Sequence, residues 1–549
     1  MSQVTYFICI VLISLPIFAR AEDGPVGWHS SGKNGAVAAG RPAAVDAGME
    51  ILQQQGGNAI DAAVATILAQ SVVRSQAFCF GGEVPIIVYD AKRGVVEVLS
   101  GQGAAPQLAT LQYFQQHHNG KIPGGHAASA AVPAVLHACC TALDRYGTRS
   151  FGEVARPMLR LLDRDEPTWC ANLARHLEKA IEAEKKAPDR STGINVVIDY
   201  FYRGPVARQL DQWSKENDGL IRYEDLASHQ TFIEQPASAN YRDLKVYKCG
   251  PWTQGPYLLQ TLRLLEGYDL KSMGHNSPDY VHTVVEAMKL GLADRDAYYA
   301  DPRKVDVPLE ALLSDKYTDL RRQLIDPEHA SLVQRVGDPL GGKALLGIQP
   351  QSYTLEKGPN RDTTTCLVAD KWGNVVAATP SGWGGVLAGD TGIVLGSRLI
   401  SLNTWKGHPN CVQPGKRPRI TLTPTLVLQD SKPIIAVSVA GGDAQDQATL
   451  QVLLNQIEFS MDSNQAITAS RFGTYHLVGS FNQPPPQLGS LTIYGPGQES
   501  TITELKTRGH KVRKRSGAYA QPITIVIDSE TGMKYAAGDP RAGRHAAAY

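Results

Sequence analysis

The chain of 549 residues has an ordinary globular composition, with 43% hydrophobic and 19% charged residues. Lysine and arginine total 54 against 53 aspartates and glutamates, which gives a formal charge of +1. Such a balance offers no electrostatic reason to expect a nucleic acid or an acidic membrane surface as a partner. A basic run at residues 506–515 is interpreted as a solvated surface segment, because one short run is weak support for polyanion binding.

The N-terminus carries an apolar run, Val4 to Phe18, followed by Ala19-Arg20-Ala21. This pattern is typical of a secretory signal peptide, so we expect residues 1–21 to be removed and the mature protein to be secreted, extracellular or periplasmic. The run is short for a membrane span, but it lacks a preceding basic stretch, so an uncleaved anchor is the alternative. Only in that case do we expect contact with a membrane.

The eight cysteines are scattered along the chain, and Cys9 leaves with the signal peptide. The seven that remain do not form a disulfide framework. No C-x-x-C pair and no histidine or cysteine spacing indicates zinc, so we predict mostly free, buried thiols and no metal site.

Proline, glycine and asparagine residues mark the ends of predicted helices in the first two thirds of the chain. Pro42 predicts the first turn of a helix that Gly56-Gly57 ends, and Asn58 predicts the N-cap of the next helix. A strand is expected at 85–89, after a glycine pair, and much of 125–300 indicates helix, including a long one from Pro278 to Ala300. Residues 325–361 predict an irregular polar connector, which is the natural place for a cleavable segment.

The pattern changes after Asp362. Strands are expected at 363–369, 375–379, 425–428 and 434–439, and a helix follows the glycine pair Gly441-Gly442. We therefore predict stacked sheets with helices outside them.

The triple threonine Thr363-Thr364-Thr365 is by composition a plain strand start. Its chemistry becomes distinctive only if the chain breaks before Thr363. A terminal α-amine has a reference pKa of about 7.7–8.0, so it can act as a base at neutral pH for the hydroxyl of the same residue. One residue would then supply both nucleophile and base.

Two further features fit the same chemistry. Gly441-Gly442 lies between a strand and a helix start, where backbone N–H groups and the helix dipole can stabilise an oxyanion, although a plain turn would look the same. Pro380 and Gly382 can hold a bend that points the Ser381 hydroxyl at Thr363, although Ser381 could be an ordinary turn serine.

An ordered set of motifs connects these features. In chain order they are Gly56-Gly57-Asn58-Ala59-Ile60-Asp61-Ala62-Ala63, Gly81-Gly82 before Val88-Tyr89-Asp90, Tyr241-Arg242 with Val246-Tyr247 and Gln254-Gly255, Ala293-Asp294-Arg295 with Asp301-Pro302, Asp362-Thr363-Thr364 with Asp370 and Gly373-Asn374, Pro414-Gly415-Lys416-Arg417-Pro418-Arg419 with Thr423-Pro424-Thr425, and Gly441-Gly442-Asp443. Over roughly residues 30–545 this set resembles the γ-glutamyltransferase (γ-glutamyltranspeptidase) family of N-terminal-nucleophile hydrolases.

The resemblance implies an α+β fold, a four-layer αββα sandwich built from both halves of the chain. It also implies a precursor cut between Asp362 and Thr363 into a large-subunit region, 22–362, and a small-subunit region, 363–549, which stay associated. By match, the catalytic residues are Thr363 as nucleophile, Ser381 as its hydrogen-bond partner, and Gly441 and Gly442 as oxyanion hole. Substrate-binding positions fall at Gln102, Arg398, Thr421 and Asp443.

The sequence departs from the γ-glutamyl enzymes in its recognition residues. Gln102 stands where they place an arginine for the substrate α-carboxylate, and glutamine cannot form that charged, bidentate clamp. Of two adjacent hydroxyl positions Thr421 is kept, whereas the other is Ile420. The segment 398–401 lacks the carboxylate that holds the α-amine, and Thr365 replaces the usual histidine. This pattern is similar to a γ-glutamyltransferase-like branch that includes amidohydrolases acting on other acyl amides.

The leading hypothesis is a self-processing threonine amidohydrolase or acyltransferase. It would cleave a γ-glutamyl or related acyl amide through an acyl-enzyme on Thr363, which water or an amine acceptor resolves, without any metal or organic cofactor. Within the enzyme class, the alternative is an acyl-amide hydrolase that is not specific for glutamyl groups. Outside it, the alternatives are a non-catalytic secreted homologue acting as a binding protein, and an interaction protein recruited through the basic segment.

Overall fold

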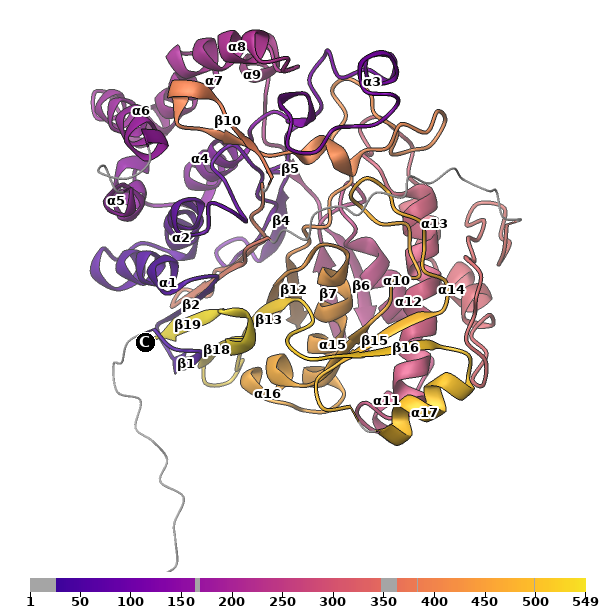
Figure 1. The fold of residues 1–549 in the computed structure, drawn as a ribbon. Helices are drawn as coiled ribbons and strands as arrows, with labels where there is room; N and C mark the ends of the chain where they lie inside the picture. The colour runs from indigo at the N-terminus through magenta and orange to yellow at the C-terminus, as the bar shows by residue number, and fades with distance from the viewer. Residues whose placement is uncertain (1–25, 163–167, 347–362, 383, 498) are drawn as a thin grey trace, which may run out of the picture.

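The computed structural model describes residues 26–162, 168–346, 363–382, 384–497 and 499–549. Two seven-stranded sheets lie face to face, and helices cover the outer face of each (Figure 1). This arrangement confirms the predicted αββα sandwich. The expected signal peptide, Asp362 and the end of the predicted connector lie outside the described residues.

The first sheet is antiparallel throughout and contains the strand that follows Thr363. In spatial order its strands are β19 (His545–Ala548), β2 (Gly35–Ala39), β8 (Cys366–Asp370), β9 (Val375–Ala378), β3 (Ile86–Asp90), β4 (Val95–Leu99) and β5 (Ile233–Glu234). Side chains alternate along β8, so that Val368 packs among the helices while Leu367 and Ala369 face the second sheet. Both faces of this strand are therefore buried.

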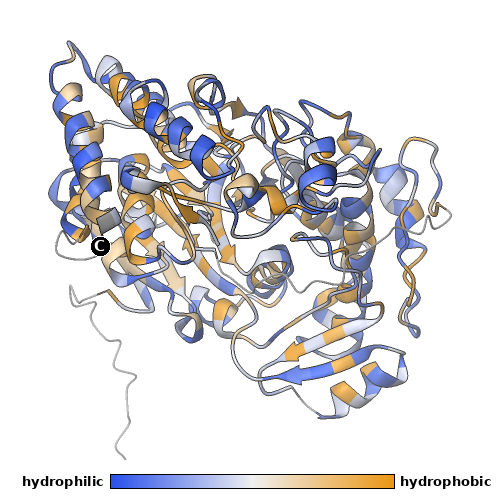
Figure 2. Cartoon of the chain, turned by 45° about the horizontal axis from the view of Figure 1, so that its top comes forward, coloured by the Kyte–Doolittle hydropathy of each residue, from blue (hydrophilic) through white to orange (hydrophobic). Residues whose placement is uncertain are grey.

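The second sheet is also antiparallel throughout. In spatial order its strands are β1 (His29–Gly32), β18 (Lys534–Gly538), β17 (Gln521–Ile527), β13 (Lys432–Ala440), β12 (Thr425–Gln429), β7 (Leu244–Lys248) and β6 (Ala237–Tyr241). The same alternation applies, because Ala436 on β13 faces the first sheet while Ile435 and Val437 pack against the outer helices. Figure 2 shows the central strands in the hydrophobic colour and the outer helices with hydrophilic stretches.

Each sheet has its own helical layer. The first sheet is covered by α1 (Pro42–Met49), α2 (Ala59–Val73), α4 (Val135–Tyr146), α5 (Phe151–Leu161), α6 (Thr168–Glu184), α7 (Arg190–Tyr202), α8 (Pro205–Glu216) and α9 (Tyr223–Ala227). The second is covered by α10 (Pro256–Leu265), α11 (Leu270–Met273), α12 (Pro278–Tyr298), α13 (Leu309–Leu312), α14 (Asp315–Arg322), α15 (Gln445–Ile457), α16 (Ser463–Thr468) and α17 (Glu499–Thr507). Smaller elements lie at the edges: α3 (Leu111–His117), β10 (Val386–Leu387), β11 (Val394–Leu395), β14 (Arg471–Gly473), β15 (Ser490–Tyr494) and β16 (Lys511–Arg515).

The helix starts that the sequence predicts are present in the structure. Pro42 occupies the first turn of α1, and Asn58 caps α2 by accepting from the N–H groups of Ile60 and Asp61. Within the described residues the seven cysteines are all free, and all but Cys411 are buried, which agrees with the prediction. Across the same residues, no helix combines the length and the hydrophobicity that a bilayer span requires.

A fully buried ion pair fixes α15 to the second sheet. Lys248 Nζ at the end of β7 donates to Asp446 Oδ1 at 2.6 Å, to Thr425 Oγ1 at 2.7 Å and to the Thr423 carbonyl at 2.7 Å. Burial lowers the pKa of Lys248 and raises the pKa of Asp446, and each charge offsets that shift in the other. Removal of one partner would leave an uncompensated charge in the interior.

We therefore expect Lys248→Met to lower the free energy of unfolding by about 3–5 kcal/mol, because Asp446 keeps its burial and loses its cation. Chemical denaturation followed by circular dichroism measures the change. Lys245→Met on the exposed face of the same strand is the control, and it should stay within about 0.5 kcal/mol of the parent. Equal effects of the two substitutions would contradict a structural role for the pair.

Candidate active site

Thr363 lies just before β8, and the surrounding backbone holds it in place. The Thr364 N–H donates to the Pro380 carbonyl at 2.9 Å, and Arg544 Nη2 donates to the Thr363 carbonyl at 3.1 Å. Gly40 packs so closely that a Cβ there would lie 2.2 Å from Thr364 Oγ1. The Thr363 side chain is therefore presented from a rigid support and not from a loose loop.

The Ser381 hydroxyl contacts the expected nucleophile. Thr363 Oγ1 donates to Ser381 Oγ at 3.4 Å, which brings together the two residues that the predicted bend and the family resemblance both paired. Ser381 is fixed by two backbone bonds to Glu83, at 2.9 and 3.0 Å. The bend predicted around Ser381 is present, since Gly382 has a φ of 142° and a Cβ there would lie 2.7 Å from the Gly82 Cα.

A buried arginine contacts the same hydroxyl. Arg398 Nη2 donates to Ser381 Oγ at 3.1 Å, and Arg398 Nε donates to Glu83 Oε1 at 2.9 Å. Both charged side chains are almost fully buried, so they form a neutral pair inside the site. The Arg398 guanidinium also lies 5.8 Å from the centroid of the Phe481 ring. Arg398 therefore orients Ser381 and brings no net charge with it.

The glycine pair reaches the nucleophile through Gln445, the first residue of α15. The amide of Gln445 lies 3.5 Å from Thr363 Oγ1 and 3.4 Å from Thr421 Oγ1. In the amide orientation that satisfies all its neighbours, Nε2 donates to the carbonyls of Val439 and Thr421 at 2.9 Å each, and Oε1 accepts from the Gly442 N–H at 3.3 Å. Sequence reasoning missed this residue, because a glutamine at a helix start carries no chemical signal by itself.

Comparison with known proteins agrees with this geometry. The gamma-glutamyltranspeptidase family model matches residues 44–190 and 173–549. The chain belongs to the gamma-glutamyltranspeptidase family. Its relatives include the glutathione hydrolase proenzyme of Escherichia coli (strain K12), which is 30% identical over 93% of this chain and 90% of the relative. The acylase ACY 1 proenzyme of Pseudomonas sp. (strain SE83) is 29% identical over 88% of both chains.

A solved cephalosporin acylase from Bacillus halodurans has the same architecture. It superposes with a TM-score of 0.80 and 25% identity over 99% of both chains. The predicted family, fold and enzyme class, a gamma-glutamyltransferase-like amidohydrolase, are thereby confirmed. The proenzyme names of the relatives agree with the expected processing of a precursor into subunits.

The residues expected at substrate-binding positions each have different neighbours. Gln102 is buried and donates to the Gly103 carbonyl at 3.0 Å, and its Oε1 is one of the buried polar atoms without a hydrogen-bond partner in the described chain. Thr421 faces Gln445, whereas the side chain of Ile420 packs in the core between the two sheets. Ile420 therefore offers the substrate neither a hydroxyl nor a free surface.

Asp443 has protein partners for its carboxylate. Arg295 Nη1 donates to Asp443 Oδ1 at 2.7 Å, and the Ser480 N–H donates to Asp443 Oδ2 at 2.9 Å. Burial alone would raise the pKa of Asp443, but the Arg295 charge and the bonds from Ser480 lower it below the usual value. In this family member Asp443 supports the turn after Gly442, and its predicted contact with substrate stays a prediction.

The thiol of Cys79, beside the bend after Ser381, is not a second nucleophile. Cys79 Sγ donates to the Gly382 carbonyl at 2.6 Å, but burial raises the pKa of this thiol far above its usual value, so it stays protonated. Within the ranges that the structure describes, no group of three or more histidine, cysteine, aspartate or glutamate side chains is arranged to hold a metal ion.

We expect Ser381→Ala to lower kcat for amide hydrolysis by about 10- to 100-fold, because Thr363 Oγ1 loses the hydroxyl that orients it. Ser381→Thr keeps a hydroxyl and should restore most of the rate. Ser228→Ala on the exposed end of α9 is the control. Steady-state kinetics on protein already cleaved before Thr363 checks this, and full activity of Ser381→Ala would contradict it.

Gln445→Leu should lower kcat by about 10-fold or more, since the carbonyls of Val439 and Thr421 lose their donor beside the nucleophile. Gln451→Leu is a matched control, because Gln451 is a buried glutamine on the same helix that bonds to the backbone of Phe472, away from Thr363. Both variants should lose similar thermal stability, and only the first should lose activity. A similar kinetic loss in both would assign Gln445 a purely structural role.

Proposed function

We propose that this protein is a self-processing threonine amidohydrolase that cleaves acyl amides without requiring an α-amino acid head on the acyl group. The observation that carries the proposal is the contact of Thr363 Oγ1 with Ser381 Oγ, in a site whose amino-acid clamp is altered. The names of two relatives support this substrate class, since one is a glutathione hydrolase proenzyme and the other an acylase proenzyme.

Maturation and turnover would use the same hydroxyl. Thr363 Oγ first attacks the Asp362 carbonyl, and the peptide C–N bond breaks to leave an ester on Oγ and a free Thr363 amine. Water then hydrolyses the ester, which releases the Asp362 carboxylate and restores the Thr363 hydroxyl. In turnover the amine takes the hydroxyl proton while Oγ attacks the substrate carbonyl. The proton passes to the departing amine, and water or an acceptor amine then resolves the acyl ester.

The parts around Thr363 would stabilise this sequence. The N–H groups of Gly441 and Gly442 would bind the developing oxyanion once the Gln445 amide yields its contact with Gly442. Ser381 would orient the attacking oxygen, with Arg398 orienting Ser381 in turn. Ser381 and Arg398 would keep their positions, so the Gln445 amide is the group that has to move when charge develops.

The altered recognition residues support the substrate class. A glutamyl α-carboxylate would lie beside the neutral side chain of Gln102, with the Thr421 hydroxyl as its remaining hydrogen-bond partner. An α-ammonium would lie beside the Glu83–Arg398 pair, which has no net charge. A charged head buried without partners costs several kcal/mol, which disfavours γ-glutamyl substrates relative to simple acyl amides. From the N-terminal pattern we also propose that the mature protein acts outside the cytoplasm.

The test begins with the chain itself. Purified protein should give two fragments on a denaturing gel, and N-terminal sequencing of the smaller one should start at Thr363. Thr363→Ala should stay intact and inactive, whereas Thr363→Ser keeps a hydroxyl and should be cleaved, with lower activity.

The substrate class is tested with matched 4-nitroanilides. The processed enzyme should hydrolyse a simple acyl anilide with a kcat/KM at least equal to that of the γ-glutamyl anilide. Removal of the α-amine or the α-carboxylate from the glutamyl compound should not lower that value. If hydrolysis strictly requires both the α-amine and the α-carboxylate, the proposed substrate class is wrong. If the parent chain stays intact and behaves like Thr363→Ala, the proposed enzymatic function is wrong.

A further inference from the structure

The three threonines after the predicted cut, Thr363 to Thr365, lie ahead of the paired part of the first sheet. β8 begins at Cys366, which lies opposite Ala39, the last residue of β2. From there Gly40 leads the chain away toward α1. A chain end that no neighbouring strand holds is poorly ordered unless other groups tie it down. Residues 363–365 become such an end when the bond before Thr363 is cut, so the groups that hold them affect how the nucleophile is placed.

The backbone of this threonine run alternates between two sides, as in a strand. Backbone groups of alternate residues in an antiparallel strand face the same neighbouring strand. The Thr364 N–H donates to the Pro380 carbonyl at 2.9 Å, on the side of β9. The carbonyls of Thr363 and Thr365 therefore face the opposite side, where β2 would lie if it continued past Gly40.

Two side chains supply the donors that β2 would otherwise provide. Gln70 Nε2 donates to the Thr365 carbonyl at 2.8 Å. On the other carbonyl, that of Thr363, Arg544 Nη2 donates at 3.1 Å. Both side chains are fully buried. A Cβ on Gly40 would lie 3.5 Å from Gln70 Nε2 and 3.0 Å from Arg544 Nη1, so both groups gather where β2 turns away. Side chains from two distant parts of the chain thus hold the threonine run as an extended strand.

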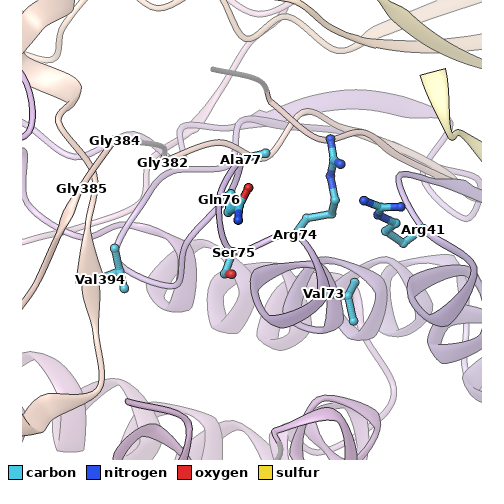
Figure 3. A pocket seen from close by; sticks show the side chains of 10 residues that line it. All are labelled: Arg41, Val73, Arg74, Ser75, Gln76, Ala77, Gly382, Gly384, Gly385 and Val394. Carbon is cyan, nitrogen blue, oxygen red and sulfur yellow. The ribbon is translucent and has the colours of Figure 1, made fainter. Parts of the chain in front are cut away.

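Gln70 reaches the threonine run from α2, which packs against β8. It lies three residues before the end of this helix. Figure 3 shows that end, where residues 73–77, Arg41 and the glycines after Ser381 line a cavity of about 720 Å³. Because Gln70 is fully buried and is not among the described residues that line the cavity, solvent there does not compete for its bond with Thr365. A hydrogen bond in such an interior is stronger than one in water.

We propose that Gln70 is a positioning residue for Thr363, which holds the cut chain end in its extended shape through the Thr365 carbonyl. The contact of Thr363 Oγ1 with Ser381 Oγ depends on that shape, because Thr363 is only two residues from the bond that Gln70 makes. The inference rests on the proposed amidohydrolase function and gives the large-subunit region a part in it after the cut. In the precursor the chain continues from Thr363 to Asp362 and holds the threonine from both sides, so Gln70 matters more for turnover than for cleavage.

The experiment compares Gln70→Met with the parent, because methionine keeps the length of the side chain and removes the donor. With fully cleaved protein and a simple acyl 4-nitroanilide, we expect kcat to fall by about 10- to 30-fold while KM stays within about two-fold. Cleavage before Thr363, followed on a denaturing gel during cell-free synthesis, should slow by no more than about three-fold, because the precursor is still tethered. Gln70→Leu should behave in the same way, so a folding defect in one variant does not decide the outcome.

Ser71→Ala is the matched control. Ser71 is the next residue of α2, is also buried, and donates its hydroxyl to the Leu68 carbonyl of the same helix at 2.7 Å. Its substitution removes one buried bond to a backbone carbonyl, as Gln70→Met does, but the bond lies within the helix. We expect the two variants to lose similar thermal stability, and Ser71→Ala to keep kcat within about two-fold of the parent.

The outcomes separate this inference from the function on which it rests. An unchanged kcat in Gln70→Met, a loss that appears mainly in KM, cleavage that slows as much as turnover, or an equal loss of kcat in Ser71→Ala overturns the positioning role, while turnover by the parent upholds the amidohydrolase. If the parent hydrolyses no amide, the proposed function fails, and hydrogen exchange at the backbone N–H groups of Thr364 and Thr365 then tests the contact alone. Faster exchange in Gln70→Met than in Ser71→Ala supports the role of Gln70, and equal exchange overturns it.

Discussion

The catalytic arrangement depends on a hydrogen bond between the two sheets. Ser438 on β13 of the second sheet donates to the Ala378 carbonyl on β9 of the first at 2.8 Å, and its Oγ lies 3.0 Å from Thr379 Oγ1. Thr379 is two residues before Ser381, and Ser438 is three residues before Gly441. The bond is fully buried, so water does not compete with it. It fixes the strand end that carries the nucleophile's partner against the strand end that carries the glycine pair.

Two buried ion pairs then hold the turn after β13 in one conformation. Asp443 pairs with Arg295 on α12, and Asp446 pairs with Lys248 on β7, so the segment is anchored on both sides of Gln445. Gly441 has a φ of 142° and Gly442 a φ of 57°, where other residues would be strained. Glycine adopts these angles without strain, and the ion pairs fix the residues that follow. The Gly441 and Gly442 N–H groups, the proposed oxyanion donors, are thereby held at fixed places on this turn.

Local sequence signals predicted those parts of the fold that local chemistry controls. The cap at Asn58, the proline start of α1, and the strands and helix after Asp362 follow from residues near one another in the chain. Local patterns also predicted stacked sheets and a bend that could point Ser381 at Thr363, whereas the four-layer αββα order came from the family motifs, because no periodicity encodes which sheets stack. The roles of Thr363, Ser381 and the glycine pair remain predictions that the geometry supports.

What the sequence could not predict involves side chains that meet across long separations. Glu83 and Arg398 are 315 positions apart, and nothing near either residue indicates the other. The same holds for Asp443 with Arg295. Gln445 becomes informative only when its amide is placed among Thr363, Thr421 and Gly442.

The Glu83–Arg398 pair indicates that the changed clamp is a reorganised site and not a decayed one. A buried arginine alone beside Ser381 would be costly, and so would a buried glutamate alone in the glycine-rich turn after Gly82. Together they are neutral, and Arg398 Nη2 still donates to the hydroxyl that contacts Thr363. Random loss of recognition residues would leave unpaired charges or gaps, whereas here each charge is paired and the contact with the nucleophile's partner is kept. Such compensation agrees with the proposed amidohydrolase, in which Thr363 acts on an acyl group without an amino-acid head.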